Sequence, residues 1–327
     1  MMRIGILGAG VIARAMSATV RGMKERGDAV ELYAVASRSQ EKADAFAKEQ
    51  GVTKAYGSYE AMLRDPDLDL VYIATPHAFH GEQIVDCVRH GKAVLCEKAF
   101  TGNARQAEEA LTLAEKEGVP VTEAIWTRYM PSRQMLLDLI DQGTIGEVCT
   151  VTANLGYAMT QKERILRPEL AGGALLDLGV YTINFASMIL GGDVTDVQST
   201  VRLFDTGCDL EESIQLTYVN GTSAQLYSTA GCRTDRHGNI YGTEGWLQVD
   251  NINNPHLISV YNTKDQLLRT LPVPEQITGY EYQVTACMKA LATGALECPE
   301  MPHAETLRVM RLMDTLRKQW GMVYPFD

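Results

Sequence analysis

A short apolar segment at the start of the chain leads directly into a glycine-rich turn. Residues 4–7 have the length and composition of a buried strand, and Gly8, Gly10 and Ala13 follow in the spacing G-x-G-x-x-A. A helical pattern begins at Val11. This is the dinucleotide-binding fingerprint, in which the first glycine permits a tight turn, the second lets a pyrophosphate approach the backbone, and the alanine lets the helix pack on the strand. The sequence therefore predicts a parallel α/β sheet with a nucleotide site at its first turn.

The start of this helix is expected to hold the phosphates. Backbone N–H groups at a helix N-terminus have no partner within the helix, and the helix dipole favours negative charge there. We therefore expect Gly8, Gly10, Val11 and Ile12 to contact the cofactor. The alternative is a glycine-rich turn that serves only packing.

Length, charge and cysteine content restrict the possible partners. A chain of 327 residues is long enough for about two domains. Its net charge of −11 argues against nucleic acid or an anionic membrane as the main partner, and no apolar run approaches the roughly 18 residues of a membrane span. Seven scattered cysteines without a C-x-x-C pair, and no signal peptide, predict reduced thiols and a cytoplasmic location.

Strand and helix patterns alternate closely through the first 124 residues. Apolar runs such as residues 70–74 and 93–96 are typical of buried parallel strands, and helical segments lie between them. This alternation predicts a doubly wound parallel sheet. Later segments contain antiparallel strand and hairpin patterns with helices beside them. We therefore expect an α/β fold, with a Rossmann domain over residues 1–124 and an α+β domain with an open, largely antiparallel sheet over residues 125–327.

The end of the second strand indicates which dinucleotide binds. An Asp or Glu at this point bonds the ribose hydroxyls of NAD, whereas this chain has Ser37 and Arg38. A serine hydroxyl donates to a 2′-phosphate, and an arginine clamps it through paired N–H groups. The sequence therefore favours NADP over NAD. The alternative is that Arg38 is a solvated residue before the next helix.

Two further strand ends carry candidate site residues, because ligands bind at the carboxyl ends of strands in open α/β sheets. Thr75, Pro76 and His80 follow one strand, and we expect them to contact the cofactor, although a histidine at this place is often only structural. Glu97 and Lys98 follow the next strand. A lysine there orients a substrate hydroxyl and keeps a neighbouring acid ionised, and Glu97 pairs with it or bonds the nicotinamide ribose. The alternative for Lys98 is an exposed loop residue.

The predicted second domain contains a polar pair within an apolar helix. Asp177 and Tyr181 are four residues apart in the helical segment 175–190, so both lie on one face, and Gly172 and Gly173 precede the helix. A carboxylate and a phenol are costly in an apolar helix unless they are satisfied. We expect them to line a site rather than to bond only nearby backbone.

Trp126 and Arg128 leave the last Rossmann strand and are candidates for the substrate pocket, with packing between domains as the alternative for Trp126. Further along, Asn220 and Gly221 form a strong hairpin signal between two strand patterns. A sheet with helices on one face leaves its other face uncovered in sequence. A homodimer would cover that face.

Several of these segments together resemble one enzyme family, the Gfo/Idh/MocA oxidoreductases. The resemblance is carried by the fingerprint, by the patterns Thr-Pro-x-x-x-His (75–80) and Val-Leu-Cys-Glu-Lys (94–98), and by Asp-x-x-x-Tyr (177–181). Residues 123–128 and 172–181 look like the branch that contains dimeric dihydrodiol dehydrogenase and NADP-dependent D-xylose dehydrogenase. The resemblance covers essentially the whole chain and is strongest in its first 190 residues.

The family implies a Rossmann domain, a second domain whose open sheet pairs subunits, and a lysine and a tyrosine beside the nicotinamide, here Lys98 and Tyr181. Two residues depart from its pattern. Ala99 replaces the proline that usually follows the lysine, and His77 stands where many members have asparagine.

The resulting hypothesis is an NAD(P)-dependent dehydrogenase that transfers a hydride between nicotinamide and a hydroxyl-bearing carbon of a sugar, polyol or cyclic diol. An unperturbed tyrosine has a pKa of about 10. Lys98 as a neighbouring cation would lower the pKa of Tyr181, the candidate acid/base, and Asp177 would hold the hydroxyl or the lysine in place.

Other functions remain open at this point. One is a non-catalytic dinucleotide-sensing or scaffold protein, which would have no need of Lys98, Asp177 and Tyr181; another is an inositol-dehydrogenase-like enzyme of the same family. A metal enzyme lacks support, since only His77 and His80 among six histidines are closely spaced. The sequence does not name the substrate.

Overall fold

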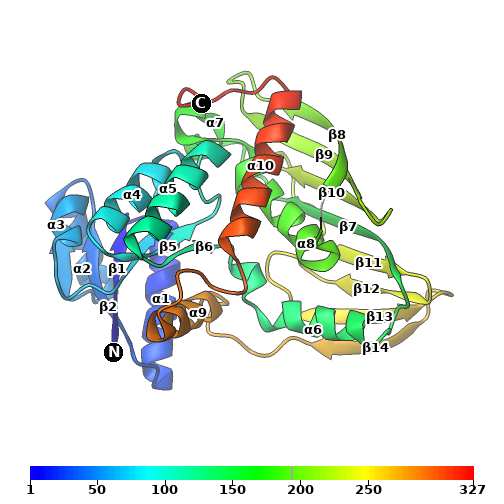
Figure 1. Cartoon of the computed structure of the whole chain (residues 1–327), viewed down its shortest axis with the longest axis horizontal. Helices are drawn as coiled ribbons and strands as arrows, with labels where there is room; N and C mark the ends of the chain where they lie inside the picture. Colours follow the sequence, from blue (N-terminus) through cyan, green and yellow to red (C-terminus); the bar gives the residue numbers. More distant parts are fainter. Residues whose placement is uncertain (193) are drawn as a thin grey trace. The chain divides into compact units, whose positions relative to one another are not determined.

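A computed structural model of the chain describes residues 1–192 and 194–327, and it divides into two compact units. The first contains residues 1–129 and 276–310, and the second contains residues 130–275 and 311–327. Figure 1 shows the helices and strands that make up each unit.

The first unit is built on a six-stranded parallel sheet with strand order β3-β2-β1-β4-β5-β6. Its central strands are buried along their whole length, as the unbroken apolar runs predict. The change of direction in strand order after β1 is the doubly wound pattern that places a ligand at the carboxyl ends of the strands. The strands are β1 (Met2–Leu7), β2 (Val30–Ala36), β3 (Lys54–Tyr56), β4 (Leu70–Ile73), β5 (Ala93–Glu97) and β6 (Val121–Ala124).

Helices connect these strands and begin and end where the sequence indicates. Ser58 and Asn103 accept hydrogen bonds from backbone N–H groups of α3 and α5, and Gly27 and Gly118 adopt the left-handed conformation that ends α1 and α5. Figure 1 shows α4 and α5 side by side, and α1 packs with α2 and α9. The helices are α1 (Val11–Arg26), α2 (Gln40–Gln50), α3 (Tyr59–Leu63), α4 (His80–Arg89), α5 (Ala104–Glu117), α9 (Glu281–Thr293) and α10 (His303–Gln319), with 3₁₀ turns at His77–Phe79 and Trp126–Arg128.

The sequence predicts a single boundary after residue 124, but the chain divides differently because residues 276–310 return to the first sheet. The N–H of Val121 donates to the carbonyl of Leu296 at 3.0 Å, and Nε2 of His303 lies 2.8 Å from the carbonyl oxygen of Val121. These bonds attach residues 276–310 to the edge strand β6, and the division falls within α10. No local pattern in the sequence marks such long-range pairing.

The second unit is built on an eight-stranded sheet with order β14-β13-β12-β11-β7-β10-β9-β8. Only β7 and β10 run parallel, so the sheet is largely antiparallel as predicted, and the hairpin at Asn220 and Gly221 joins β9 to β10. The strands are β7 (Val148–Gly156), β8 (Val194–Leu203), β9 (Asp209–Tyr218), β10 (Ser223–Thr229), β11 (Gly238–Gly242), β12 (Gly245–Val249), β13 (Leu257–Asn262) and β14 (Leu267–Pro272).

One face of this sheet is apolar and packs on α8 (Val180–Leu190), which contacts β7 and β10 in Figure 1. Buried residues such as Val151, Leu216 and Leu226 alternate with half-buried or exposed polar residues along their strands. The first turn before α8, Leu175–Gly179, is a π-helix rather than an α-helix. The other helices of this unit are α6 (Pro131–Asp141), which packs with α8, and the short α7 (Glu163–Leu166). A 3₁₀ turn lies at Pro168–Leu170.

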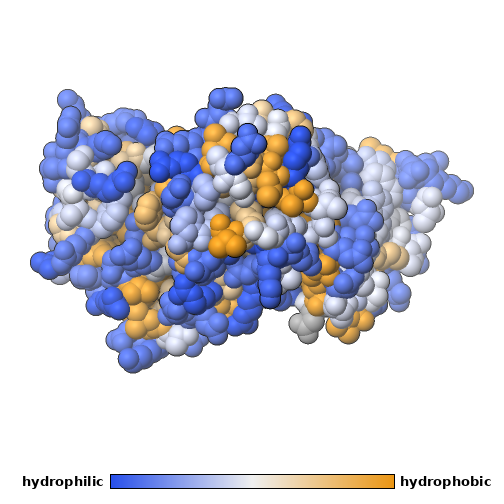
Figure 2. Space-filling model, turned by 90° about the horizontal axis from the view of Figure 1, so that it is seen from above, coloured by the Kyte–Doolittle hydropathy of each residue, from blue (hydrophilic) through white to orange (hydrophobic). Residues whose placement is uncertain are grey.

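One helical stretch corrects the expectation that no segment is apolar enough for a membrane span. Residues 168–190 are long and apolar enough to cross a membrane, by length and composition alone. Of the apolar stretch within them, 83% is buried inside the protein, as is usual for a core helix. On the face drawn in Figure 2, hydrophobic residues form small separate groups among hydrophilic ones.

Candidate active site

The fingerprint turn has the geometry that a dinucleotide requires. Gly8 has a φ of 101°, and a Cβ there would lie 2.9 Å from the carbonyl oxygen of Ala74. Gly10 begins α1, and a Cβ there would meet no atom within 4 Å. Ala13 is fully buried against the sheet, whereas Val11 is 85% exposed. The first turn of α1 contains no acidic side chain. The open N-terminus therefore fits a pyrophosphate.

The end of β2 presents one buried and one exposed candidate. Ser37 is buried, and its N–H donates to the carbonyl of Tyr56 at 3.1 Å. Arg38 is exposed. It lies close enough to Tyr59 for its charge to oppose the rise in the Tyr59 pKa that burial causes. A serine and an exposed guanidinium at this strand end fit a ribose 2′-phosphate, because both donate hydrogen bonds to it.

His80 connects the loops that follow β4 and β5. It is completely buried; its Nε2 lies 2.8 Å from the carbonyl oxygen of Thr75 and its Nδ1 lies 2.9 Å from that of Ala99. Burial lowers the pKa of His80, and the charge of Lys98 acts in the same direction. Because both ring nitrogens contact backbone oxygens, the geometry favours the structural alternative over direct cofactor contact. Thr75 itself donates to Oε1 of Gln83 at 2.6 Å.

Glu97 and Lys98 stand at the end of β5, as the sequence predicts. Glu97 is buried and accepts a hydrogen bond from the hydroxyl of Tyr72 on the neighbouring strand β4, a partner that the sequence did not indicate. Lys98 is half-buried, and the Lys98–Ala99 peptide bond is cis. The first unit therefore gathers Thr75, His80 and Lys98 at the carboxyl ends of β4 and β5.

Trp126 and Arg128, the expected substrate-pocket residues, have partners inside the first unit. The Trp126 ring stacks on Tyr280 with centroids 4.3 Å apart. Arg128 is 5% exposed; its Nη1 lies 2.9 Å from Oε1 of Glu305, and its Nε donates to the carbonyl of Glu300 at 3.2 Å. Both side chains therefore attach residues 276–310 to the end of β6, and contact with the substrate stays a prediction for both. No local pattern predicts these partners, because they lie more than 150 residues away in the chain.

Glu123, next to this pair on β6, is a titratable residue that the sequence did not single out. Its side chain is 2% exposed. Burial raises the pKa of Glu123 to about 7.

In the second unit, Asp177 lies in the π turn and Tyr181 one turn later, and both are buried. Nη1 of Arg164 lies 2.6 Å from Oδ1 of Asp177, so the carboxylate has a cationic partner that the sequence did not predict. π turns interrupt helices most often at functional sites. The preceding glycines are required by close approach: a Cβ on Gly172 would lie 2.6 Å from the carbonyl oxygen of Ile165.

Comparisons with known proteins match the two parts of the chain to two domains of one family. Residues 2–125 match the family described as oxidoreductase family, NAD-binding Rossmann fold, and residues 134–248 match the GFO/IDH/MocA C-terminal domain. The chain belongs to the Gfo/Idh/MocA oxidoreductase family. It is therefore an NAD(P)-binding oxidoreductase with a Rossmann domain.

Similar family members include trans-1,2-dihydrobenzene-1,2-diol dehydrogenases. That of Mus musculus is 32% identical over 335 residues, covering 100% of this chain and 99% of the relative, and that of Xenopus tropicalis is 33% identical, covering 90% and 91%. Among solved structures, a 3-ketoreductase from Actinomadura kijaniata in complex with NADP and TDP-benzene has a TM-score of 0.86 at 27% identity, covering 97% of both chains. An aldose-aldose oxidoreductase from Caulobacter crescentus shares the fold, with a TM-score of 0.87 at 22% identity and 98% coverage of both chains.

Proposed function

We propose that this family member is an NADP-dependent dehydrogenase that oxidises a secondary hydroxyl of a cyclic diol, sugar or polyol, or reduces the corresponding carbonyl. The observation that carries the proposal is the placement of Thr75 and Lys98 at the carboxyl ends of β4 and β5, together with the open fingerprint turn at Gly8 and Gly10. The full-length similarity to dihydrodiol dehydrogenases supports the substrate class.

The chain's own residues supply binding and proton transfer. A dinucleotide held at this site would supply the hydride acceptor or donor, its nicotinamide ring. Backbone N–H groups at Gly10, Val11 and Ile12 would hold its phosphates at the start of α1, with Thr75 and Pro76 lining the same edge of the sheet.

Tyr181 is proposed as the acid/base that takes or returns the hydroxyl proton of the substrate. Its ordinary pKa of about 10 is too high for a base near neutral pH. Lys98 is proposed as the cation that lowers it. Asp177, held by Arg164 at 2.6 Å, would then orient the groups that carry the proton.

A substrate panel tests the function directly. Pentoses, hexoses, inositols and cyclic trans-diols are offered with NADP and with NAD, and reduction of the dinucleotide is followed by its absorbance. We expect turnover with at least one cyclic diol or sugar. Tight NADP binding without turnover of any member, in either direction, would instead favour the non-catalytic sensing function.

The preference for NADP over NAD is also proposed. It is supported by Ser37 and the exposed Arg38 at the end of β2, where no acidic side chain stands to bond the ribose hydroxyls. The similar 3-ketoreductase was solved with NADP. We propose a cytoplasmic location as well, since all seven cysteines are free thiols.

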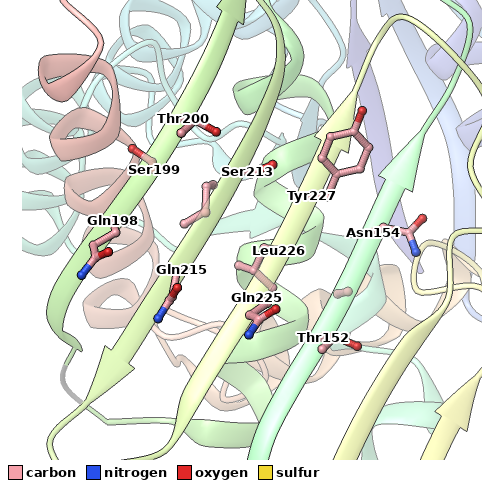
Figure 3. A pocket seen from close by; sticks show the side chains of 12 residues that line it. Thr152, Asn154, Gln198, Ser199, Thr200, Ser213, Gln215, Gln225, Leu226 and Tyr227 are labelled. Carbon is pink, nitrogen blue, oxygen red and sulfur yellow. The ribbon is translucent and has the colours of Figure 1, made fainter.

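We propose further that the polar face of the second sheet pairs two copies of the chain. One uncharged polar residue from each strand lies in register across the whole sheet, and Figure 3 shows part of this face from close by. In order from β8 to β14 the row is Gln198, Gln215, Gln225, Thr152, Asn239, Gln248, Ser259 and Thr270.

Amide and hydroxyl groups both donate and accept hydrogen bonds, so such a row is complementary to its own copy across a two-fold axis. We expect light scattering at micromolar concentration to give twice the 36.0 kDa chain mass. Gln215→Glu should give monomers, because the new carboxylate would enter a row of uncharged polar residues that holds no cationic partner for it, whereas Gln142→Glu at the end of α6 should not. A 36.0 kDa particle from the unaltered protein would contradict the dimer.

A further inference from the structure

Two carboxyl side chains lie completely buried beneath the helix that carries Asp177 and Tyr181. Asp209 and Glu212 both belong to β9 and are 0% and 1% exposed. The mechanism above uses neither. Since buried carboxyl groups are costly unless they are bonded or protonated, their place in the second unit calls for a role.

Asp209 caps the start of the π turn. Its Oδ2 accepts a hydrogen bond from the N–H of Leu175 at 2.5 Å, and Leu175 is the first residue of that turn. A Cβ on Gly173 would lie 1.9 Å from Oδ1 of Asp209, so a glycine is required at that position. A carboxylate at a helix N-terminus is stabilised by the free N–H groups and by the helix dipole.

Glu212 lies at the other end of the same turn. A Cβ on Gly179, the last residue of the π turn, would lie 2.6 Å from Oε1 of Glu212. Ser228 is paired with Glu212 on the neighbouring strand β10, and its hydroxyl lies 3.2 Å from that of Thr182. Thr182 in turn donates to the carbonyl of Gly179 at 2.9 Å.

The pKa values of the two carboxyl groups differ. Burial raises the pKa of Asp209 to about 6, but the N–H groups at Leu175 and Ala174 act against this rise. Burial raises the pKa of Glu212 further, and the nearby charge of Asp209 adds to the effect. As the pH rises, Asp209 is therefore the member of the pair that ionises first, and Glu212 keeps its proton longer. The other titratable groups that act on the pair are Cys208, Glu211 and Tyr324.

We propose that Asp209 and Glu212 are positioning residues, which hold the two ends of the π turn Leu175–Gly179 and thereby fix Asp177 and Tyr181 for proton transfer. Asp209 holds the start of the turn through its hydrogen bond, and Glu212 fills the space that Gly179 leaves beneath its end. The inference rests on the proposed function of Tyr181, but the hold on the turn is measurable without any substrate.

Asp209→Asn and Glu212→Gln form a matched pair, since each replaces a carboxyl by an amide of the same shape. Glu212→Gln keeps a neutral polar group of the same shape, so it should disturb backbone hydrogen exchange of residues 175–179 less than Asp209→Asn does. Asp209→Asn removes the charge at the helix start. It should raise exchange of residues 175–179 at least tenfold and lower kcat at least tenfold, with the Kd of NADP unchanged within twofold.

The inference is overturned if Asp209→Asn leaves exchange and kcat unchanged, or if Glu212→Gln disturbs both as much as Asp209→Asn does. Should Asp209→Asn fail to fold, Glu212→Gln still decides. The protection factors of residues 175–179 should fall in the unaltered protein as the pH is raised and Glu212 loses its proton, and they should stay constant in Glu212→Gln. The same pH dependence in both proteins would overturn the inference.

Tyr181→Phe separates this inference from the proposed function. It should keep the exchange pattern of residues 175–179 while it loses turnover. If Tyr181→Phe keeps turnover, the proposed acid/base is wrong, whereas the exchange results for Asp209 and Glu212 still stand or fall by themselves.

Discussion

Glycines precede both helices on which the proposed chemistry depends, but the space beside the two glycines differs. A Cβ on Gly10 in the first unit would point into open space, whereas a Cβ on Gly173 in the second unit would lie 1.9 Å from the buried carboxylate of Asp209. Both helices thus have their N-terminal N–H groups placed for an anion. At α1 the expected anion is the pyrophosphate of a bound dinucleotide, whereas before α8 it is the carboxylate of Asp209. A glycine pair before a helix therefore does not distinguish a ligand site from an internal cap.

The largest effect is expected at Tyr181, which the second of these helices carries. Tyr181→Phe keeps the ring and removes the hydroxyl, so the fold and NADP affinity should be unchanged while kcat falls about 10²–10⁴-fold. Steady-state kinetics and a cofactor titration on the same sample measure both. Lys98→Met should also lower kcat, and the double variant should lose little more than either single one, because both residues act on one proton transfer. A loss below about threefold in Tyr181→Phe would make Tyr181 a core residue.

Gly173→Ala tests the internal cap. Gly173 has a φ of 116°, and the added methyl would collide with Asp209. We expect the free energy of unfolding to fall by about 3 kcal/mol or more, measured by urea denaturation. Gly27→Ala is the matched control: its φ is 99° but its Cβ would meet no atom within 4 Å, so it carries the backbone cost of about 1 kcal/mol alone. Equal losses in the two variants would show that the collision with Asp209 is relieved at no cost.

Gly10→Ala tests the opposite case. The φ of Gly10 is −93°, which any residue adopts, and the methyl has space, so stability should change by less than about 0.5 kcal/mol. NADP affinity should nevertheless fall about tenfold, because the methyl would stand where the pyrophosphate approaches the backbone. Isothermal titration with NADP measures the Kd. Unchanged affinity would mean that the space above Gly10 is not the phosphate site.

The smallest effect is expected at the adenosine end of the same site. Arg38→Ala removes an exposed guanidinium, and the ratio of the Kd values for NAD and NADP should fall about tenfold, with NAD binding itself unchanged. Glu41→Ala, an exposed change in the next helix, serves as the control. Equal binding of NAD and NADP by the unaltered protein would contradict the assigned preference.

Local patterns predicted the elements well and their partners poorly. The apolar runs, Ser58, Asn103 and the helix-ending glycines place most strands and helices of the first unit, because burial period, capping and positive φ are properties of neighbouring residues. The short strands β3 and β11 were not predicted. β11 contains two glycines and little alternation, so only its pairing with β7 and β12 defines it.

The candidate site shows the same limit. Lys98, Asp177 and Tyr181 were chosen from residue type and position alone. The contacts of the site residues could not be predicted in this way. His80 meets Ala99, Arg164 meets Asp177, and Arg128 meets Glu305 only because the folded chain brings them together. Arg128 is an example. The sequence predicts that it binds substrate, but it cannot show that the guanidinium forms a buried ion pair with Glu305.

The sequence by itself determined the Rossmann fingerprint, the family and the residues that the proposed chemistry needs, because turn geometry, strand burial and reactive side chains are encoded locally. Only the tertiary structure decided that residues 276–310 return to the edge of the first sheet, that eight uncharged polar residues align across the second, and that Asp209 and Glu212 lie beneath the π turn. These features depend on strand register and on contacts between segments far apart in the chain, which are fixed by the packing of the whole core and not by any local pattern.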